Sequence, residues 1–427
     1  MFTKVKMSKK YVRQEKSQRK HPVASSASSL ITAPVVPTVP KERPGWKGPG
    51  FIKKTPKQAQ QSGQSNSARA TSIIQEQRLP IPLQQLLLNV LQKAVPACRD
   101  YEILKPMLQE IRLALSNGAS DGAFSRPDWM DAYVVRWSSI RALSCATVLA
   151  AMFDLVAEDV WVQNLLKDRR TIESPSRATC FGGGPTELMA FAAVLRHIRP
   201  PLTDLKSPGI VQPQTDDGSS AVPEVAAPIM KLHLVDKANW TPSVLCLETG
   251  LLSPPVLSKY ASQSAKLNNI SFIPPGDLST SLLQTDILGA SQDELAAIIG
   301  STPSLITFFF TLDDLHTTST AKTAALLLKL TLVAPKDSLL LVVDSPEPPP
   351  NAAAGVEEAE NKKRRYRMGK WLDLVLMDKF VFADAPGKPA WKYLLRDEDR
   401  LFKLGEGLKF PISLDHVRFQ IHLFKKQ

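Results

Sequence analysis

The segment Arg177–Leu188 combines residue types that fit a loop for a nucleotide-like cofactor. It reads Arg-Ala-Thr-Cys-Phe-Gly-Gly-Gly-Pro-Thr-Glu-Leu, which predicts a short strand, a glycine turn and a helix start. Gly182, Gly183 and Gly184 let the backbone turn sharply and approach a ligand closely, because no Cβ is in the way. The segment therefore predicts a cofactor site, and the residues after the glycines indicate which cofactor.

Two of these residues belong to the start of the predicted helix. Pro185 suits the first turn, where its missing N–H costs nothing, and the Glu187 carboxylate is favoured by the helix dipole. Glu187 can accept a hydrogen bond from a cofactor amine or hydroxyl. It also occupies the third glycine position of the dinucleotide fingerprint, where a carboxylate would face a pyrophosphate, so NAD and FAD are disfavoured. No Gly-Lys-Ser/Thr follows, which excludes a Walker loop. S-adenosylmethionine (SAM) has a positive sulfonium and no phosphate, so it tolerates the carboxylate.

An acid follows the next predicted strand, Met230–Asp236. In a doubly wound sheet the acid that ends the second strand binds the ribose hydroxyls of the cofactor. The separation of Asp236 from Gly184 exceeds the usual ~20 residues. We attribute the excess to 202–228, a stretch rich in Pro, Ser, Gly and Asp that predicts an inserted surface loop. Asp236 is therefore a candidate ribose ligand, with a plain turn or helix-cap role as the alternative.

The rest of the chain alternates predicted strands and helices. The strands are expected at 269–273, 304–312, 337–344, 391–395 and 417–424, and the helices at 320–333 and 368–380. This alternation predicts an open α/β sheet with right-handed crossovers, and the polar–apolar alternation of 417–424 suits an antiparallel strand. Asp277 follows the third strand and can accept from the adenine amino group, or serve only as a turn residue.

Residues 80–170 are predicted to form a helical N-terminal region. Apolar residues recur at helical spacing over 82–94, 101–116 and 129–156. These helices would cover one edge of the sheet or form a platform on the substrate side. Arg136 and Arg141 either reach RNA phosphates or the substrate base, or are held in salt bridges.

The net charge of +12 is concentrated in one segment. Residues 1–79 hold 16 Lys/Arg and 3 Glu, whereas the remainder holds 37 basic and 38 acidic residues. The segment is also rich in Pro, Ser and Gln, so we expect a disordered basic tail. Such a tail binds RNA phosphates with strong salt dependence and is typical of a nuclear address. A second basic run, 362–367, is expected within an inserted loop at 346–367, either as an RNA contact or as a solvated loop.

Cysteine and histidine usage predicts no metal site. The six histidines and four cysteines show no ligand spacing, and each cysteine lies in an apolar context typical of a buried free thiol: Cys98, Cys145, Cys180 and Cys246. No run of 18 apolar residues occurs, so no membrane span is expected.

Several motifs together resemble the fungal large-subunit (25S) rRNA uridine-N3 methyltransferases. They are Cys180–Leu188, Asp236-x-x-x-Trp240, Phe310–Leu315, Trp371–Leu374 and Val417–Phe424, with Val135–Ala142 similar to that family's pre-domain helix. The resemblance covers roughly 80–427. It implies a Rossmann-like class I SAM-dependent methyltransferase domain at 171–427, with a seven-stranded sheet whose last strand is antiparallel. It also implies ribosomal RNA of the pre-60S particle as the partner and a nucleolar location; we expect a monomer.

The resemblance further implies methylation of uridine N3, a weakly acidic imide nitrogen. Thr311, Asp313 and Asp314 follow the fourth strand, where such enzymes hold the acceptor base. Asp314 is the preferred residue for accepting the N3 proton, because the family tends to place an acid at that step; the alternative role of either aspartate is to cap the next helix.

Two residues depart from the family's pattern. Thr186 stands where Gly or Ala is usual, and Cys180 leaves no acid before the glycines, a contact that Glu187 would replace. These departures support an alternative, a catalytically inactive methyltransferase-like ribosome-assembly or RNA-binding factor.

Overall fold

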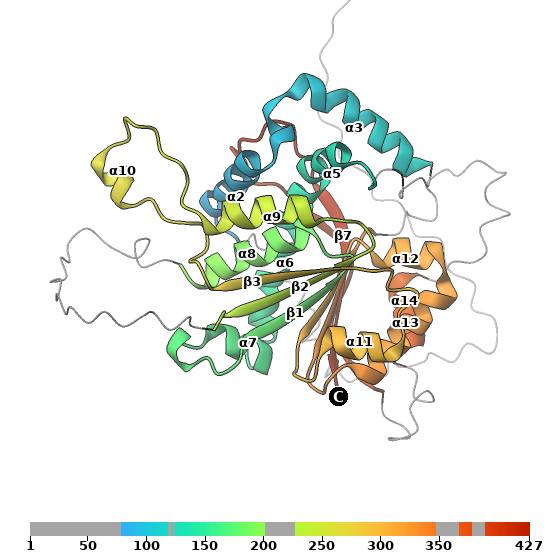
Figure 1. Cartoon of the computed structure of the whole chain (residues 1–427). Coiled ribbons are helices and arrows are strands. Elements are labelled where there is room, and N and C mark those ends of the chain that lie inside the picture. The colour runs from blue at the N-terminus through green and yellow to red at the C-terminus, as the bar shows by residue number, and fades with distance from the viewer. Residues whose placement is uncertain (1–77, 118–121, 123, 201–226, 347–366, 378–388) are drawn as a thin grey trace, which may run out of the picture. The chain divides into compact units, whose positions relative to one another are not determined.

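A seven-stranded sheet with helices on both faces organises the part of the chain that the structure describes (Figure 1). The structure, a computed structural model, describes residues 78–117, 122, 124–200, 227–346, 367–377 and 389–427. The strands run in the order β3-β2-β1-β4-β5-β7-β6. Their bounds are β1 Ser176–Phe181, β2 Met230–Asp236, β3 Leu278–Gln284, β4 Leu305–Phe309, β5 Leu339–Asp344, β6 Trp391–Phe402 and β7 Val417–Lys426. Strands β1 to β5 pair in parallel, and β7 pairs antiparallel with β5 and β6.

The helices alternate with the strands, as the sequence pattern predicts. Their bounds are α2 Ile81–Ala94, α3 Tyr101–Ser116, α5 Pro127–Tyr133, α6 Ser139–Leu155, α7 Val160–Leu166, α8 Pro185–Ile198, α9 Thr241–Leu252, α10 Gln263–Leu267, α11 Gln292–Ile299, α12 Leu312–Thr318, α13 Thr320–Val333 and α14 Met368–Leu376. The expected Rossmann-like class I fold, with its antiparallel last strand, is confirmed by this topology.

Strand β5 shows how the sheet divides the core into two layers. Leu339, Leu341 and Val343 belong to one buried cluster, whereas Leu340 and Val342 belong to the other. Successive side chains of a strand point to opposite faces, and a parallel strand covered on both faces is apolar throughout. The first layer holds α2, α6, α8 and α9, and the second holds α11 to α14 (Figure 1).

The predicted helical region shares the first of these cores. Its long apolar stretch is three segments in the structure: α5, a π-helical turn at Val134–Ser138 and then α6, which packs against α8. Within the described part of the chain, Pro127–Leu155 is long and apolar enough to cross a membrane, but 83% of its apolar window is buried inside the protein. A helix that is apolar all round is typical of a core, so this is weak evidence for a span.

The prediction of a third strand at 269–273 is wrong: the third strand is β3, Leu278–Gln284, and 269–273 forms no strand. The apolar run is instead a buried loop: the Ile273 N–H donates to the Leu251 carbonyl at 3.0 Å, and Arg196 donates to the carbonyls of Ser271 and Phe272. Side-chain donors and helix ends therefore satisfy backbone groups that a strand would have paired. The apolar residues of 269–273 correctly indicated a buried segment, but a buried loop and a buried strand have the same apolar pattern.

Three other expectations changed in detail. Strand β4 ends at Phe309, because Phe310 has a positive φ of 54° that a strand cannot continue. Strand β6 extends to Phe402, well beyond the expected Leu395. Cys246 is exposed, since α9 buries the face that carries Val244 and Leu247. The basic tail up to residue 77, most of the two inserted loops and 378–388 lie outside the described residues.

Candidate functional site

The glycine turn after β1 joins three parallel strands at their carboxyl ends. Gly182 has φ +70°, and the N–H groups of Gly182 and Gly183 both donate to the Val235 carbonyl of β2, at 2.8 and 3.2 Å. A Cβ added at Gly182 would overlap the side chain of Thr311, which follows β4. Glycine is therefore required here both by backbone conformation and by space.

The next two glycines are equally confined. A Cβ at Gly183 would come within 2.5 Å of the Cys180 carbonyl oxygen, and one at Gly184 would lie 3.0 Å from the Trp240 ring. Helix α8 then begins at Pro185, as expected, and Thr186 lies buried in its first turn.

Glu187 caps the helix on which it lies. Its Oε2 accepts the Gly184 N–H at 2.7 Å, and only 2% of the residue is exposed. Burial raises the pKa of Glu187 to about 8, although the Gly184 hydrogen bond and the Arg141 charge act in the opposite direction. The group is thus a neutral acid near pH 7 that can both donate and accept hydrogen bonds.

Asp236 ends β2 beside this turn. Its Oδ1 accepts the Ala238 N–H at 2.7 Å, and burial raises its pKa to about 6. Asp236 and Gly183 line the same cavity of ≈ 170 Å³, together with Asn239 and Gln284. This is the arrangement that a nucleoside cofactor needs: a carboxylate for the ribose next to a glycine backbone without side chains.

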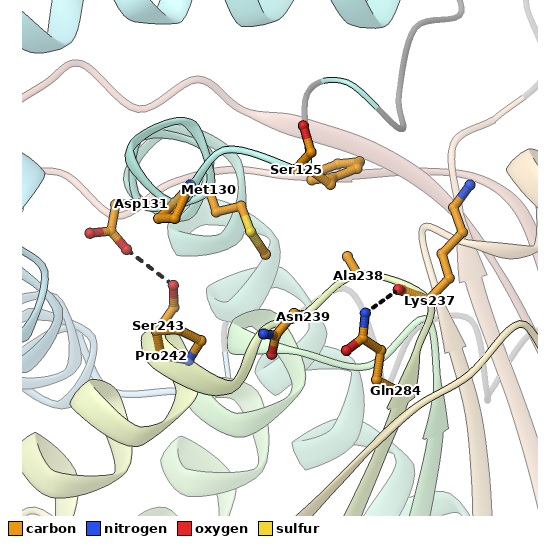
Figure 2. Close-up of a pocket in the computed structure, with 11 residues that line it drawn as sticks. Ser125, Met130, Asp131, Lys237, Ala238, Asn239, Pro242, Ser243 and Gln284 are labelled. Carbon is orange, nitrogen blue, oxygen red and sulfur yellow. Dashed lines mark hydrogen bonds between the residues drawn. The ribbon is translucent and has the colours of Figure 1, made fainter.

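A larger cavity of ≈ 550 Å³ adjoins the first one, since Ala238, Asn239 and Gln284 line both (Figure 2). Helix α5 and the chain before it form its other wall, with Met130 pointing inward and Ser125 at the rim. Two hydrogen bonds fix that wall and the floor. Ser243 donates to Asp131 at 3.0 Å, and Gln284 donates to the Lys237 carbonyl at 3.1 Å (Figure 2). The sequence carried no signal for this wall beyond the helical spacing of 129–156.

The end of β4 carries the three predicted catalytic candidates. Thr311 precedes α12 without capping it, and the Asp313 N–H instead donates to Asp344 Oδ2 at 2.9 Å. Asp344, at the end of β5, thus supplies the helix cap that the sequence suggested for Asp313 or Asp314, and burial raises the pKa of Asp344 to about 7. Asp314 lies in the first turn of α12, where burial raises its pKa and the Arg141 charge lowers it.

Aromatic rings from the helical region that precedes β1 lie over the glycine turn. Tyr133 lies 5.0 Å from Phe124, 5.1 Å from Trp137 and 5.9 Å from Trp240, measured between ring centroids. Since Trp240 in turn faces Gly184, this cluster forms a lid of side chains over the start of α8. Sequence reasoning did not identify Tyr133 or Phe124.

The structure does not bring Asp277 to this site. Asp277 precedes β3, so it lies at the amino-terminal edge of the sheet, opposite Asp236. Its carboxylate forms an ion pair with Arg169, and its backbone carbonyl accepts the N–H groups of Ile229 and Met230. The predicted adenine contact is therefore wrong; it depended on the misplaced third strand.

The two arginines of the predicted pre-domain helix have different environments. Arg136 pairs with Asp415, which is the structural role that the sequence left open. The Arg141 guanidinium instead lies 4.6 Å from the centroid of the Phe310 ring, beside the end of β4. Only Arg141 belongs to the site. Among the described residues, no group of three or more His, Cys, Asp or Glu side chains could hold a metal ion.

The residues present fit an adenosyl cofactor without phosphates. The three glycines leave no space for a Cβ, and Gly183 lines one cavity with the ribose carboxylate Asp236. The described residues that line this cavity include no Lys or Arg that would pair with a phosphate. Gly182, Gly183, Gly184, Glu187 and Asp236 are the residues that would hold it.

Comparison with known proteins identifies a family. Residues 91–425, well over half of the chain, match the model of a family described as "Putative SAM-dependent methyltransferase". A comparison with curated proteins finds no match.

Solved structures similar to this chain include three methyltransferases. An O-methyltransferase family protein from Burkholderia thailandensis has 9% identity and a TM-score of 0.30, over 79% of this chain and 76% of that one. The 16S rRNA (adenine(1408)-N(1))-methyltransferase from Catenulisporales acidiphilia has 13% identity and a TM-score of 0.28, over 62% and 91%. The CurJ carbon methyltransferase has 11% identity and a TM-score of 0.29, over 84% and 70%. Because these TM-scores are low, the family assignment depends on the sequence match.

Proposed function

This chain belongs to the family of SAM-dependent methyltransferases, and from that premise we propose that it methylates N3 of a uridine in large-subunit ribosomal RNA during ribosome assembly. Support comes from the set of motifs that resembles the uridine-N3 enzymes and from the positions of their residues. Asp236 and Trp240, from one motif, line a cavity together with Gly183, and Asp314, from a second motif, follows Thr311, whose side chain fills the space beside Gly182.

The observation that carries the proposal is the position of Asp314. It lies one helical turn beyond Thr311, whose side chain fills the space that a Cβ at Gly182 would need, so the helix that carries Asp314 begins at the glycine turn. When bound, SAM supplies an electrophilic methyl group on its sulfonium sulfur. Asp314 would accept the N3 proton of the uracil imide, which leaves the nitrogen free to attack. Burial raises the pKa of Asp314 from its ordinary value and so brings it closer to that of a weak acid such as the imide.

N3 lies on the pairing edge of uracil, so the target uridine must be unpaired or extruded from a helix. Aromatic side chains near Asp314 suit an extruded base: the Tyr133 ring lies 5.1 Å from that of Trp137, and the Tyr133 hydroxyl accepts a hydrogen bond from Arg141. A planar base can stack on aromatic rings of this kind.

Mass spectrometry of nucleosides from the large-subunit rRNA of cells that lack this protein tests the proposal. We expect one 3-methyluridine to disappear and to return when the wild-type gene is restored. An unchanged 3-methyluridine content, with loss of a different methylated nucleoside, would give the enzyme another acceptor. An unchanged content of every methylated nucleoside would favour the inactive assembly factor.

The basic segment 1–79 supports RNA as the partner class, and it is tested separately. Deleting it removes 16 Lys/Arg, so the affinity for rRNA should fall at low salt and the dependence of log K on log[salt] should become shallower. An unchanged slope would mean that the segment makes no phosphate contacts.

A further inference from the structure

The Arg141 guanidinium is held in a fixed position between two aromatic rings. It lies 4.6 Å from the centroid of the Phe310 ring and 6.0 Å from that of Tyr133. One nitrogen, Nη1, donates to the Tyr133 hydroxyl at 2.6 Å. Such stacking and hydrogen bonding orient the planar group before any ligand arrives.

Most of the donors of Arg141 remain available. A guanidinium has five N–H donors, and within the described ranges the Arg141 side chain makes one hydrogen bond, to a neutral phenol, and no ion pair. Arg136, five residues earlier, has a carboxylate partner in Asp415. A partly buried arginine with unused donors is a site for an anion, since burying its charge without a partner is costly.

The acids near Arg141 do not supply that anion. Its charge acts on both Glu187, in the first turn of α8, and Asp314, in the first turn of α12. Glu187 is occupied by the Gly184 N–H and has a pKa of about 8, so it is mostly neutral at pH 7. A ligand carboxylate placed here would meet Arg141 from one side and leave the two acids to a ligand ammonium.

The strand order sets the direction of the cofactor. The ribose ligand Asp236 ends β2, the glycine turn follows β1, and Phe310 follows β4, in the sheet order β2-β1-β4. A linear molecule anchored by its ribose at Asp236 and lying across the glycines must extend its other end toward β4. This direction would bring the amino-acid end of SAM, with its carboxylate and ammonium, toward Phe310 and Arg141.

We propose that Arg141 binds the α-carboxylate of the methionine end of SAM through two parallel N–H···O hydrogen bonds. The guanidinium fork matches a carboxylate in geometry as well as charge. This inference depends on the cofactor and not on the identity of the acceptor nucleotide.

The test compares two ligands that differ only in the carboxylate, SAM and decarboxylated SAM. Calorimetric affinities of the full-length protein are measured for the wild type and for Arg141→Met, which keeps length and apolar contact with Phe310. We expect Arg141→Met to weaken the affinity for SAM about 10- to 100-fold, the range for hydrogen bonds to charged groups. The affinity for decarboxylated SAM should change less than about twofold. Arg141→Lys keeps the charge without the fork, so its loss should be intermediate.

Arg136→Met is the matched control, because it removes an arginine from the same helical segment whose partner is Asp415. It should leave both affinities unchanged. Equal weakening of both ligands by Arg141→Met would assign Arg141 a role in packing the site, and unchanged SAM affinity with loss of RNA affinity would assign it to the acceptor. Either result would overturn the proposal. If Arg141→Met does not fold, the affinities of Arg141→Lys for SAM and decarboxylated SAM are compared in the same way.

Discussion

Thr311 packs directly against the backbone of Gly182, so the end of β4 and the turn after β1 fit together without space for a methyl group. Gly182→Ala would place its Cβ on the Thr311 side chain and force an alanine to φ +70°. We expect a loss of about 2–4 kcal/mol in the free energy of unfolding, from overpacking and from the left-handed backbone. Denaturant titration of the apo protein measures it.

Gly289→Ala is the control for this substitution. A Cβ at Gly289 has the nearest atom at 3.6 Å and no positive φ is involved, so stability should change little. In the double variant Gly182→Ala/Thr311→Gly the overlap disappears while the backbone strain remains, so about half of the loss should be recovered. No recovery would mean that the backbone conformation alone requires glycine.

Asp236 and Asp277 give a second prediction, because Asp236 lies at the carboxyl ends of the parallel strands and Asp277 at their amino ends. Asp236→Asn should weaken SAM binding about 10-fold, since a neutral amide replaces a charged hydrogen-bond acceptor for the ribose. Asp277→Asn should leave SAM affinity unchanged and lower the free energy of unfolding by about 1–3 kcal/mol, because it breaks the pair with Arg169. Calorimetry and denaturant titration separate the two effects. A loss of SAM affinity in Asp277→Asn would contradict the edge assignment.

The sequence predicted those parts of the fold that local chemistry determines. The turn at Gly182 and the strand end at Asp236 are recorded in neighbouring residues, and both were found where expected. The third strand was misplaced because Phe272 and Ile273 are buried by a loop, and burial alone does not distinguish loop from strand. Because of this error, Asp277 was predicted at the carboxyl ends of the parallel strands, whereas it lies at their amino ends.

The rest of the site depends on contacts between segments far apart in the chain. Arg141 is 169 residues from Phe310, and no periodicity reports that the two are stacked. Asp344 caps α12 from the end of a different strand, so the cap could not be found by searching before Asp313. Such partners appear only when the sheet brings the strand ends together.

Glu187 gives a prediction about pH. Its pKa is about 8 in the folded protein and 4.5 ordinarily, so folding takes up a proton between these values. The stability contributed by the protonated group is complete below pH 4.5 and is lost as pH rises through 8. Glu187→Gln keeps an acceptor for Gly184 and cannot ionise. The midpoint temperature of thermal unfolding should therefore fall less steeply with rising pH in the apo variant than in the apo wild type between pH 5 and 8.

Some pH dependence should remain in Glu187→Gln. Asp236 and Asp344, with pKa values of about 6 and about 7, shift in the same direction and still titrate. Curves of equal slope for variant and wild type would show that Glu187 is ionised in the folded protein throughout this range.

Asp314 provides the prediction closest to the chemistry. If it accepts the N3 proton, Asp314→Asn should lower the single-turnover rate of methyl transfer about 10²- to 10⁴-fold while SAM affinity stays within about twofold, because an amide cannot take up the proton. Asp313→Asn is the matched control: its backbone N–H keeps the bond to Asp344 and should preserve most of the rate. The pH profile adds a readout that a purely structural role would not produce, since the wild-type rate should rise with pH through the raised pKa of Asp314 and the residual rate of Asp314→Asn should lack that step. Equal losses in both variants would instead indicate that this turn of α12 supports the fold.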